Sequence, residues 1–273
     1  ALGYAQTLYL LPISLFGMAI AAAELPELSR QRALPKEMLA EQISAALERI
    51  HFLVVPSMVA FILFGDLLIG GIYQRGSFLA TDTPVVYAVL AAYALGLVAT
   101  AGSRVLSSAF YALRDTRTPA RMAYLRVSVS LALGVALMFP LDRLGVSGLH
   151  YGAVGLALGS AVAAWIEYIL LRRSLGRAVG PHGAKPGVRW RISVAVLVAG
   201  IVAVVAKWML GSSVPGRDAL VLEWFGERLE WLVLPTLAMG TALAFGMSYL
   251  AVASRLGVGA PLTQVLRRGA RRP

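Results

Sequence analysis

The sequence contains no cysteine and few charged residues. Without cysteine, the chain has neither disulfides nor thiolate metal ligands. Charged residues make up 14% of its 273 residues, whereas a soluble globular domain carries about 25%. Hydrophobic residues make up 58%, and the mean hydropathy is +0.73. This balance excludes a disordered chain and an ordinary soluble enzyme, and it indicates a protein that crosses a membrane several times.

Apolar stretches long enough to cross a bilayer, which needs about 20 residues, occur seven times. They cover residues 2–23, 50–69, 85–113, 120–141, 151–171, 192–210 and 232–254. Because lipid offers no hydrogen-bond partners to the backbone, such stretches form helices. The predicted fold class is therefore all-α, a polytopic membrane helix bundle with seven transmembrane helices.

The basic residues alternate between the connecting segments. Eighteen of the 25 Lys and Arg residues fall in the first, third and fifth connections, at the span ends next to them, or in the C-terminal tail, and five fall in or next to the other three connections. By the positive-inside rule, the N-terminus lies outside and the C-terminus lies in the cytoplasm of a bacterial cytoplasmic membrane. This orientation accounts for the net charge of +11, so no nucleic-acid partner is expected. The first residue is Ala1, and no basic segment precedes the first span, so we expect a fragment that has lost its N-terminus.

Two connections are longer than the others and suggest how the chain is organised. Residues 36–49 carry apolar side chains at helical spacing, which predicts an amphipathic helix on the inner membrane face. Residues 173–187 are rich in Gly, Pro and basic residues, which predicts a flexible linker. We therefore expect residues 1–172 to form one transport unit of five spans, and residues 188–273 to form an appended helix pair with a basic tail.

Polar side chains inside the spans are the candidate functional residues, because lipid makes them costly. Arg104 lies about two turns from the inner end of the third span. It either snorkels to the lipid headgroups or faces a cavity that receives an anionic headgroup. The first span contributes Tyr4, Gln6 and Thr7, which either line this cavity or hydrogen-bond to other helices.

Three further charged residues lie nearer the ends of their spans. We expect Arg126 to snorkel to the membrane surface, and Asp66 and Glu167 to lie at the interface. The small residues Gly155 and Gly159 are expected to let two helices approach closely.

Signs of enzymatic chemistry are weak throughout the sequence. The histidines His51, His150 and His182 lack the spacing of metal ligands. No Walker-type phosphate loop and no paired carboxylates on one span occur. We therefore expect no catalytic residues, no metal site and no cofactor.

Three ordered motifs resemble the MurJ/MviN family of lipid II flippases. They are LPISLFGMAIAAAELPELSR at 11–30, LLIGGIYQRGSF at 67–78 and AFYALRDTRTPARMA at 109–123. The resemblance implies that this chain corresponds to helices 8–14 of a fourteen-helix transporter whose N-terminal lobe is missing here. Such a transporter moves the lipid-linked peptidoglycan precursor lipid II from the inner to the outer leaflet by alternating access between two lobes, without hydrolysing a nucleotide. The expected partners are lipid II or a similar polyprenyl-pyrophosphate glycolipid, membrane lipids and the missing lobe.

The resemblance also assigns individual residues. Its inner-loop motif corresponds to Arg114, Asp115, Thr116, Arg117, Thr118 and Pro119, which we expect to form a structured turn capped by Asp115 and Thr118. Arg104 falls where members often carry a basic residue. Members often carry an acid–arginine pair and a further acid where this chain has Gln6, Thr7 and Leu10. Some bind sodium through Asn and Asp on the helix that corresponds to the fourth span, and since this span lacks both, we expect no such site.

Three other functions stay open on the sequence. The cargo of the same superfamily could be another polyprenyl-pyrophosphate oligosaccharide, of O-antigen or exopolysaccharide type. A membrane enzyme acting on polyprenyl-phosphate sugars would need an acidic or histidine cluster at the membrane face. A non-transporting scaffold for cell-wall proteins would have a sealed bundle without a polar cavity.

Overall fold

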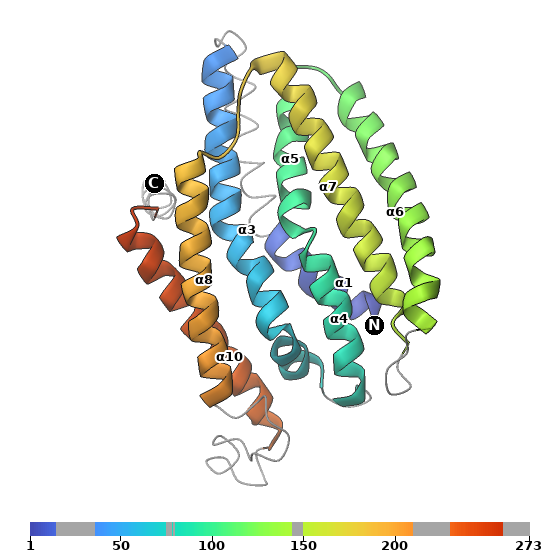
Figure 1. The fold of residues 1–273 in the computed structure, drawn as a ribbon, viewed down its shortest axis with the longest axis vertical. Coiled ribbons are helices and arrows are strands. Elements are labelled where there is room, and N and C mark those ends of the chain that lie inside the picture. Colours follow the sequence, from blue (N-terminus) through green and yellow to red (C-terminus); the bar gives the residue numbers. More distant parts are fainter. Residues whose placement is uncertain (15–35, 75–77, 79, 144–149, 210–229, 259–273) are drawn as a thin grey trace, which may run out of the picture. The chain divides into compact units, whose positions relative to one another are not determined.

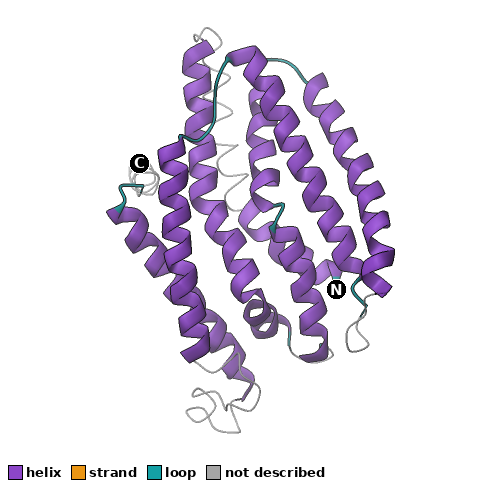
Figure 2. Ribbon diagram, viewed as in Figure 1, coloured by secondary structure: helices purple, strands orange, loops and turns teal. Residues whose placement is uncertain are grey.

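The computed structural model describes residues 1–14, 36–74, 78, 80–143, 150–209 and 230–258. Every regular element in these ranges is a helix (Figure 2). Five helices are long and apolar enough to cross a membrane, and a bent pair makes a sixth candidate span. The predicted all-α membrane bundle is confirmed. Of the seven predicted spans, the first is described only through residue 14, with α1 at Leu2–Pro12, and residues 15–23 of that span lie outside the described residues.

The chain divides into two compact units. Unit 1 comprises residues 1–58 and 84–185, and unit 2 comprises residues 59–83 and 186–273. The predicted division placed everything before residue 173 in one unit. The structure instead assigns the second half of the second span to the same unit as the last two spans, because its side chains pack against those helices.

Unit 1 is built around α7 (Gly152–Val179), which lies between α5 (Leu97–Ala112) and α6 (Arg117–Arg143) (Figure 1). Glycines set the spacing of α6 and α7. A Cβ atom added at Gly159 would lie 2.5 Å from the backbone nitrogen of Gly134, and one added at Gly155 would lie 2.6 Å from the carbonyl carbon of Leu137. Real side chains do not tolerate these distances, so the two backbones can meet here only through glycine.

The third predicted span is broken into α4 (Thr83–Ala94) and α5, which are bent by 40°. The break at Leu95 and Gly96 leaves the Leu95 carbonyl without a helical partner, and the indole nitrogen of Trp165 donates a 2.8 Å hydrogen bond to it. Gly96 is needed because a Cβ there would lie 2.8 Å from the Cα of Ala161. Irregular backbone inside a membrane requires this kind of internal partner.

The predicted surface helix at 36–49 is part of a much longer element. Helix α3 (Lys36–Tyr73) runs without interruption through the start of the second span, so 36–49 is not a separate helix. Its helical geometry is interrupted at Phe64, and the part before this residue, 36–63, corresponds to a length of about 42 Å, more than the roughly 30 Å of a bilayer core. The apolar residues Ile43, Leu47 and Ile50 are buried, as the amphipathic pattern predicts.

The predicted flexible linker at 173–187 is largely structured. Helix α7 continues through its first seven residues to Val179, and α8 (Pro186–Met209) begins at its end. The turn between them is held by hydrogen bonds from the backbone N–H groups of Gly183 to Ser44 Oγ and of Lys185 to Glu48 Oε1, both 3.0 Å. Glycine is required at Gly183 because its φ is +134°.

Unit 2 contains the second part of α3, the short 3-10 turn η2 (Ala80–Asp82), α8 and α10 (Glu230–Arg255). Helices α8 and α10 pack against each other (Figure 1). Asp66, which we predicted at the interface, forms an ion pair with Lys207 of α8, with Nζ 2.6 Å from Oδ2. The carboxylate and the ammonium thus neutralise each other near the ends of two apolar helices.

Candidate functional site

Four helices of unit 1 meet at a chain of polar side chains, which we call the polar cluster: Tyr9 of α1, Thr100 of α5, Arg126 of α6 and Glu167 of α7. The Tyr9 hydroxyl donates to Thr100 Oγ1 over 2.9 Å. Arg126 donates to Thr100 Oγ1 through Nη2 over 3.3 Å and to Glu167 Oε2 through Nη1 over 2.9 Å. A single arginine therefore links the hydroxyl pair to the carboxylate.

Burial makes the ion pair of the cluster important for the fold. The Glu167 side chain is 8% exposed and that of Arg126 is 27% exposed. A carboxylate buried this deeply is costly unless a cation pairs with it. The prediction that Arg126 snorkels to the membrane surface is therefore wrong, because its side chain turns toward Glu167 across the α6–α7 contact. The depth of Glu167 in the membrane stays a prediction.

The sequence did contain a signal for this pair. Arg126 precedes the end of α6 by 17 residues, and Glu167 follows the start of α7 by 15 residues. In two antiparallel helices, such residues reach nearly the same depth. Opposite charges at equal depth in neighbouring spans predict an ion pair.

Arg104 lies one turn beyond Thr100 on α5, so the two share a helix face. It is partly exposed. In the described part of the chain its guanidinium makes no hydrogen bond and no ion pair, unlike that of Arg126. An arginine keeps its charge in any protein environment and offers five donors in a fixed plane. Among the described residues, the position thus provides a cation without an internal partner next to the polar cluster.

The three candidate residues of the first span lie on a different face of α1 from Tyr9, which is the residue that α1 contributes to the polar cluster. Tyr4, Gln6 and Thr7 are exposed, and the Thr7 hydroxyl donates to the Gly3 carbonyl of its own helix. Tyr9, which the sequence reasoning did not select, lies on the buried face and makes the interhelical hydrogen bond. The cluster thus includes none of the three candidates, although they remain accessible.

The inner-loop motif forms a capped turn. Arg114, two residues beyond the end of α5, has a φ of +60°. Asp115 then accepts hydrogen bonds from the backbone N–H groups of Arg117 and Thr118 and from the Thr118 hydroxyl. These hydrogen bonds, the one from the hydroxyl above all, hold the pKa of Asp115 below its ordinary value. The cap is therefore present at neutral pH and lost when acid protonates the carboxylate, and Pro119 is buried in the first turn of α6.

A metal site finds no support in the described residues. Within the ranges that the structure covers, no group of three His, Asp or Glu side chains is placed to hold an ion. The charged groups there can bind an anion through arginine or pair internally.

Comparisons with known proteins agree on one family. The family description "Lipid II flippase MurJ" matches residues 1–225. A probable lipid II flippase MurJ of Rhizobium meliloti is 31% identical over 252 residues, which cover 90% of this chain and 44% of that protein. One of Rhizobium tropici is 35% identical over 178 residues, 65% of this chain and 32% of that protein.

A solved structure gives the same result for the fold. A lipid II flippase MurJ in an inward closed conformation matches with a TM-score of 0.68 and 21% identity, covering 93% of this chain and 47% of that one. The chain thus spans at most about half the length of these proteins. Since the family match covers well over half of the sequence, this chain belongs to the lipid II flippase MurJ family.

Proposed function

We propose that this chain is the C-terminal part of a transporter that flips lipid II from the inner to the outer leaflet of the bacterial cytoplasmic membrane. The observation that carries the proposal is the available guanidinium of Arg104 on the helix face of the polar cluster, in a chain of the MurJ family. A glycan on a pyrophosphate cannot cross hydrocarbon unaided, so it needs a polar, cationic path. Arginine suits a pyrophosphate because it binds phosphate oxygens with two parallel hydrogen bonds.

The residues of the path have separate roles in this proposal. Arg104 contacts the pyrophosphate, and the exposed face of α1, with Tyr4, Gln6 and Thr7, contacts the sugars through hydrogen bonds. The polar cluster keeps α1, α5, α6 and α7 together, so that Arg104 is presented at a fixed place. Movement of two lobes against each other, of which this chain supplies part of one, then exposes the path to either side.

The cargo is tested in cells from which the resident lipid II flippase is depleted. The complete gene product that contains this chain is expected to restore growth and to expose lipid II on the outer face of spheroplasts, measured by cleavage with an externally added lipid II-degrading toxin. Restored export of an O-antigen or exopolysaccharide lipid, without restored exposure of lipid II, would instead assign the alternative cargo.

The orientation is a separate prediction, with the N-terminal end of this chain outside and its C-terminal end in the cytoplasm. Because the chain has no cysteine, single cysteines can report it once any cysteine elsewhere in the gene product is replaced. Thr81 and Thr116 are exposed threonines in consecutive connections. Thr81→Cys should react with a membrane-impermeant maleimide in intact cells, and Thr116→Cys should react only after permeabilisation. The reverse labelling pattern would overturn the orientation.

A further inference from the structure

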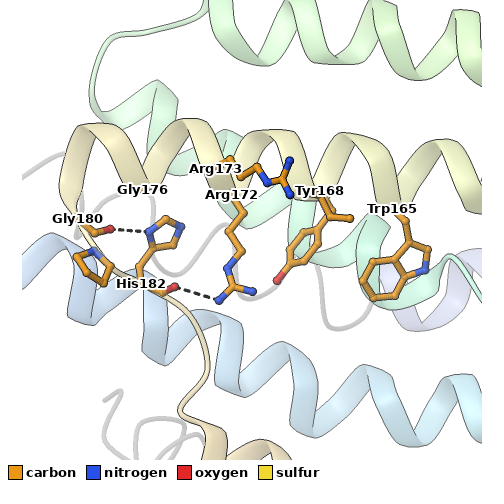
Figure 3. A pocket seen from close by; sticks show the side chains of 9 residues that line it. Trp165, Tyr168, Arg172, Arg173, Gly176, Gly180 and His182 are labelled. Carbon is orange, nitrogen blue, oxygen red and sulfur yellow. Dashed lines mark hydrogen bonds between the residues drawn. The ribbon is translucent and has the colours of Figure 1, made fainter.

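A groove runs along the exposed side of α7 near its C-terminal end, outside the polar cluster. It has a volume of about 560 Å³, and its walls include Trp165, Tyr168, Ile169, Arg172, Arg173 and His182. Figure 3 shows Trp165, Tyr168 and Arg172 following one another along one side of the helix. We call it the α7 groove. Glu167, on the buried face of the same helix, points instead into the polar cluster.

The α7 groove is apolar at one end and cationic at the other. Trp165 and Ile169 are 39% and 42% exposed, large values for apolar side chains. Arg172 and Arg173 follow Ile169 by about one helical turn and Trp165 by about two, where the apolar part of α7 ends. At 1.5 Å per residue, Trp165 lies about 10 Å deeper along the helix than Arg172. This order matches a lipid lying along the helix, with its headgroup at the arginines and its chain at the deeper, apolar end.

Arg172 is held in position by the turn that follows α7. Its Nη2 donates to the carbonyl oxygen of His182 over 3.3 Å (Figure 3). Gly183 leaves room for the guanidinium, because a Cβ there would lie 2.5 Å from Nη2. The N–H of Gly183 is itself bound to Ser44 Oγ of α3. The arginine is therefore built into the fold, and the hydrogen bond to His182 uses one of its five donors.

Arg173 is more exposed than Arg172 and adds a second cation. In the part of the chain that the structure describes, its side chain makes no hydrogen bond and no ion pair. Basic pockets at the membrane boundary recognise anionic lipid headgroups, and Trp and Tyr side chains favour the same depth. A free phosphate ion would use only the arginine end and would leave the apolar end of the groove, at Ile169 and the exposed part of the Trp165 ring, uncovered.

We propose that the α7 groove binds one anionic glycerophospholipid of the surrounding leaflet, with its phosphate at Arg172 and Arg173 and an acyl chain along Ile169 and Trp165. The phosphate shields two adjacent like charges, and the lipid covers apolar surface on α7. Binding therefore stabilises the end of α7 and the turn at 180–185, which in turn holds the first part of α3 through Ser44 and Glu48. This makes unit 1 responsive to the anionic lipid content of the membrane, independently of any cargo.

The test uses the complete gene product, purified in a neutral detergent, and native mass spectrometry during stepwise addition of phosphatidylglycerol or phosphatidylcholine. Phosphatidylglycerol is expected to bind in preference. The double variant Arg172→Gln/Arg173→Gln should weaken its binding by at least about tenfold, because both charge-assisted contacts are lost. The control Arg121→Gln removes an equally exposed arginine from α6 and should leave binding unchanged. Unchanged affinity in the double variant would overturn the proposal.

Two further variants keep the result interpretable. Arg173→Gln alone removes no hydrogen bond and no ion pair of the described structure, so it should fold normally and still weaken phosphatidylglycerol binding. Ile169→Asn should weaken the binding of the lipid but not that of inorganic phosphate. Equal stabilisation by inorganic phosphate, or displacement of phosphatidylglycerol by stoichiometric lipid II, would replace the proposal with a simple phosphate site or a cargo site. Neither outcome bears on whether the gene product restores lipid II exposure in cells.

Discussion

Replacing Arg126 with methionine should destabilise the folded protein by about 2–4 kcal/mol, because it leaves the carboxylate of Glu167 buried without its cation. Thr100 keeps its hydrogen bond from Tyr9, so the damage is confined to the ion pair. The measurement is the free energy of unfolding, obtained by denaturing detergent titration of the complete gene product.

The double variant Arg126→Met/Glu167→Gln separates the ion pair from simple packing. It removes both charges and should recover most of the lost stability, to within about 1 kcal/mol of the parent, since the remaining buried groups are neutral. Arg121→Met, one and a half turns earlier on α6 and exposed, is the matched control and should change stability by less than about 0.5 kcal/mol. If Arg126→Met is no less stable than Arg121→Met, the ion pair does not contribute to the free energy of unfolding.

The variant Arg104→Ala should lose transport without losing the fold. If the guanidinium contacts the pyrophosphate, its removal weakens headgroup binding by about 1.5–3 kcal/mol, which corresponds to roughly ten- to hundredfold. Because the side chain makes no hydrogen bond or ion pair within the described residues, the free energy of unfolding should stay at the parent value. The readouts are growth after flippase depletion, lipid II exposure and the protein level in the membrane.

Arg104→Lys is the informative companion of this variant. It keeps the charge but loses the planar pair of donors, so it should recover part of the activity. Arg121→Ala should transport normally, which excludes a general effect of removing a basic residue near the inner face. Normal lipid II exposure by Arg104→Ala at an unchanged protein level would remove Arg104 from the cargo path.

The positions of the membrane spans could be predicted from the sequence because hydropathy depends on short segments. The break at Leu95 and Gly96 could not be predicted from the sequence, because these residues are apolar like their neighbours. The break depends on Trp165, whose indole provides the missing partner from 70 residues away in the chain. A local pattern contains no information on such a long-range hydrogen bond.

The structures of the two longer connections, residues 36–49 and 173–187, could not be predicted in full for a related reason. Gly and Pro in residues 173–187 predict flexibility, but at Gly183 the positive φ serves a turn that is bound to α3. The apolar spacing of residues 36–49 predicts one apolar helix face, which we expected to lie against the membrane surface. The pattern cannot say what covers that face, and in the structure Ile43, Leu47 and Ile50 are buried within the protein. The candidates Gln6 and Thr7 were selected for polarity, whereas the cluster uses Tyr9, because burial rather than polarity selects the groups that must pair.

The spacing of Arg126 and Glu167 has a consequence for how the chain enters the membrane during synthesis. Arg126 leaves the ribosome 41 residues before Glu167, and a lone arginine at the centre of an inserting helix costs about 2.5–3.5 kcal/mol on the translocon scale. Helices α6 and α7 therefore enter lipid most favourably together, as a hairpin whose charges are already paired. The hydrogen bond of Tyr9 can form only later still, because its acceptor Thr100 is synthesised 91 residues after it. We therefore expect these helices to leave the translocon late and together rather than one at a time.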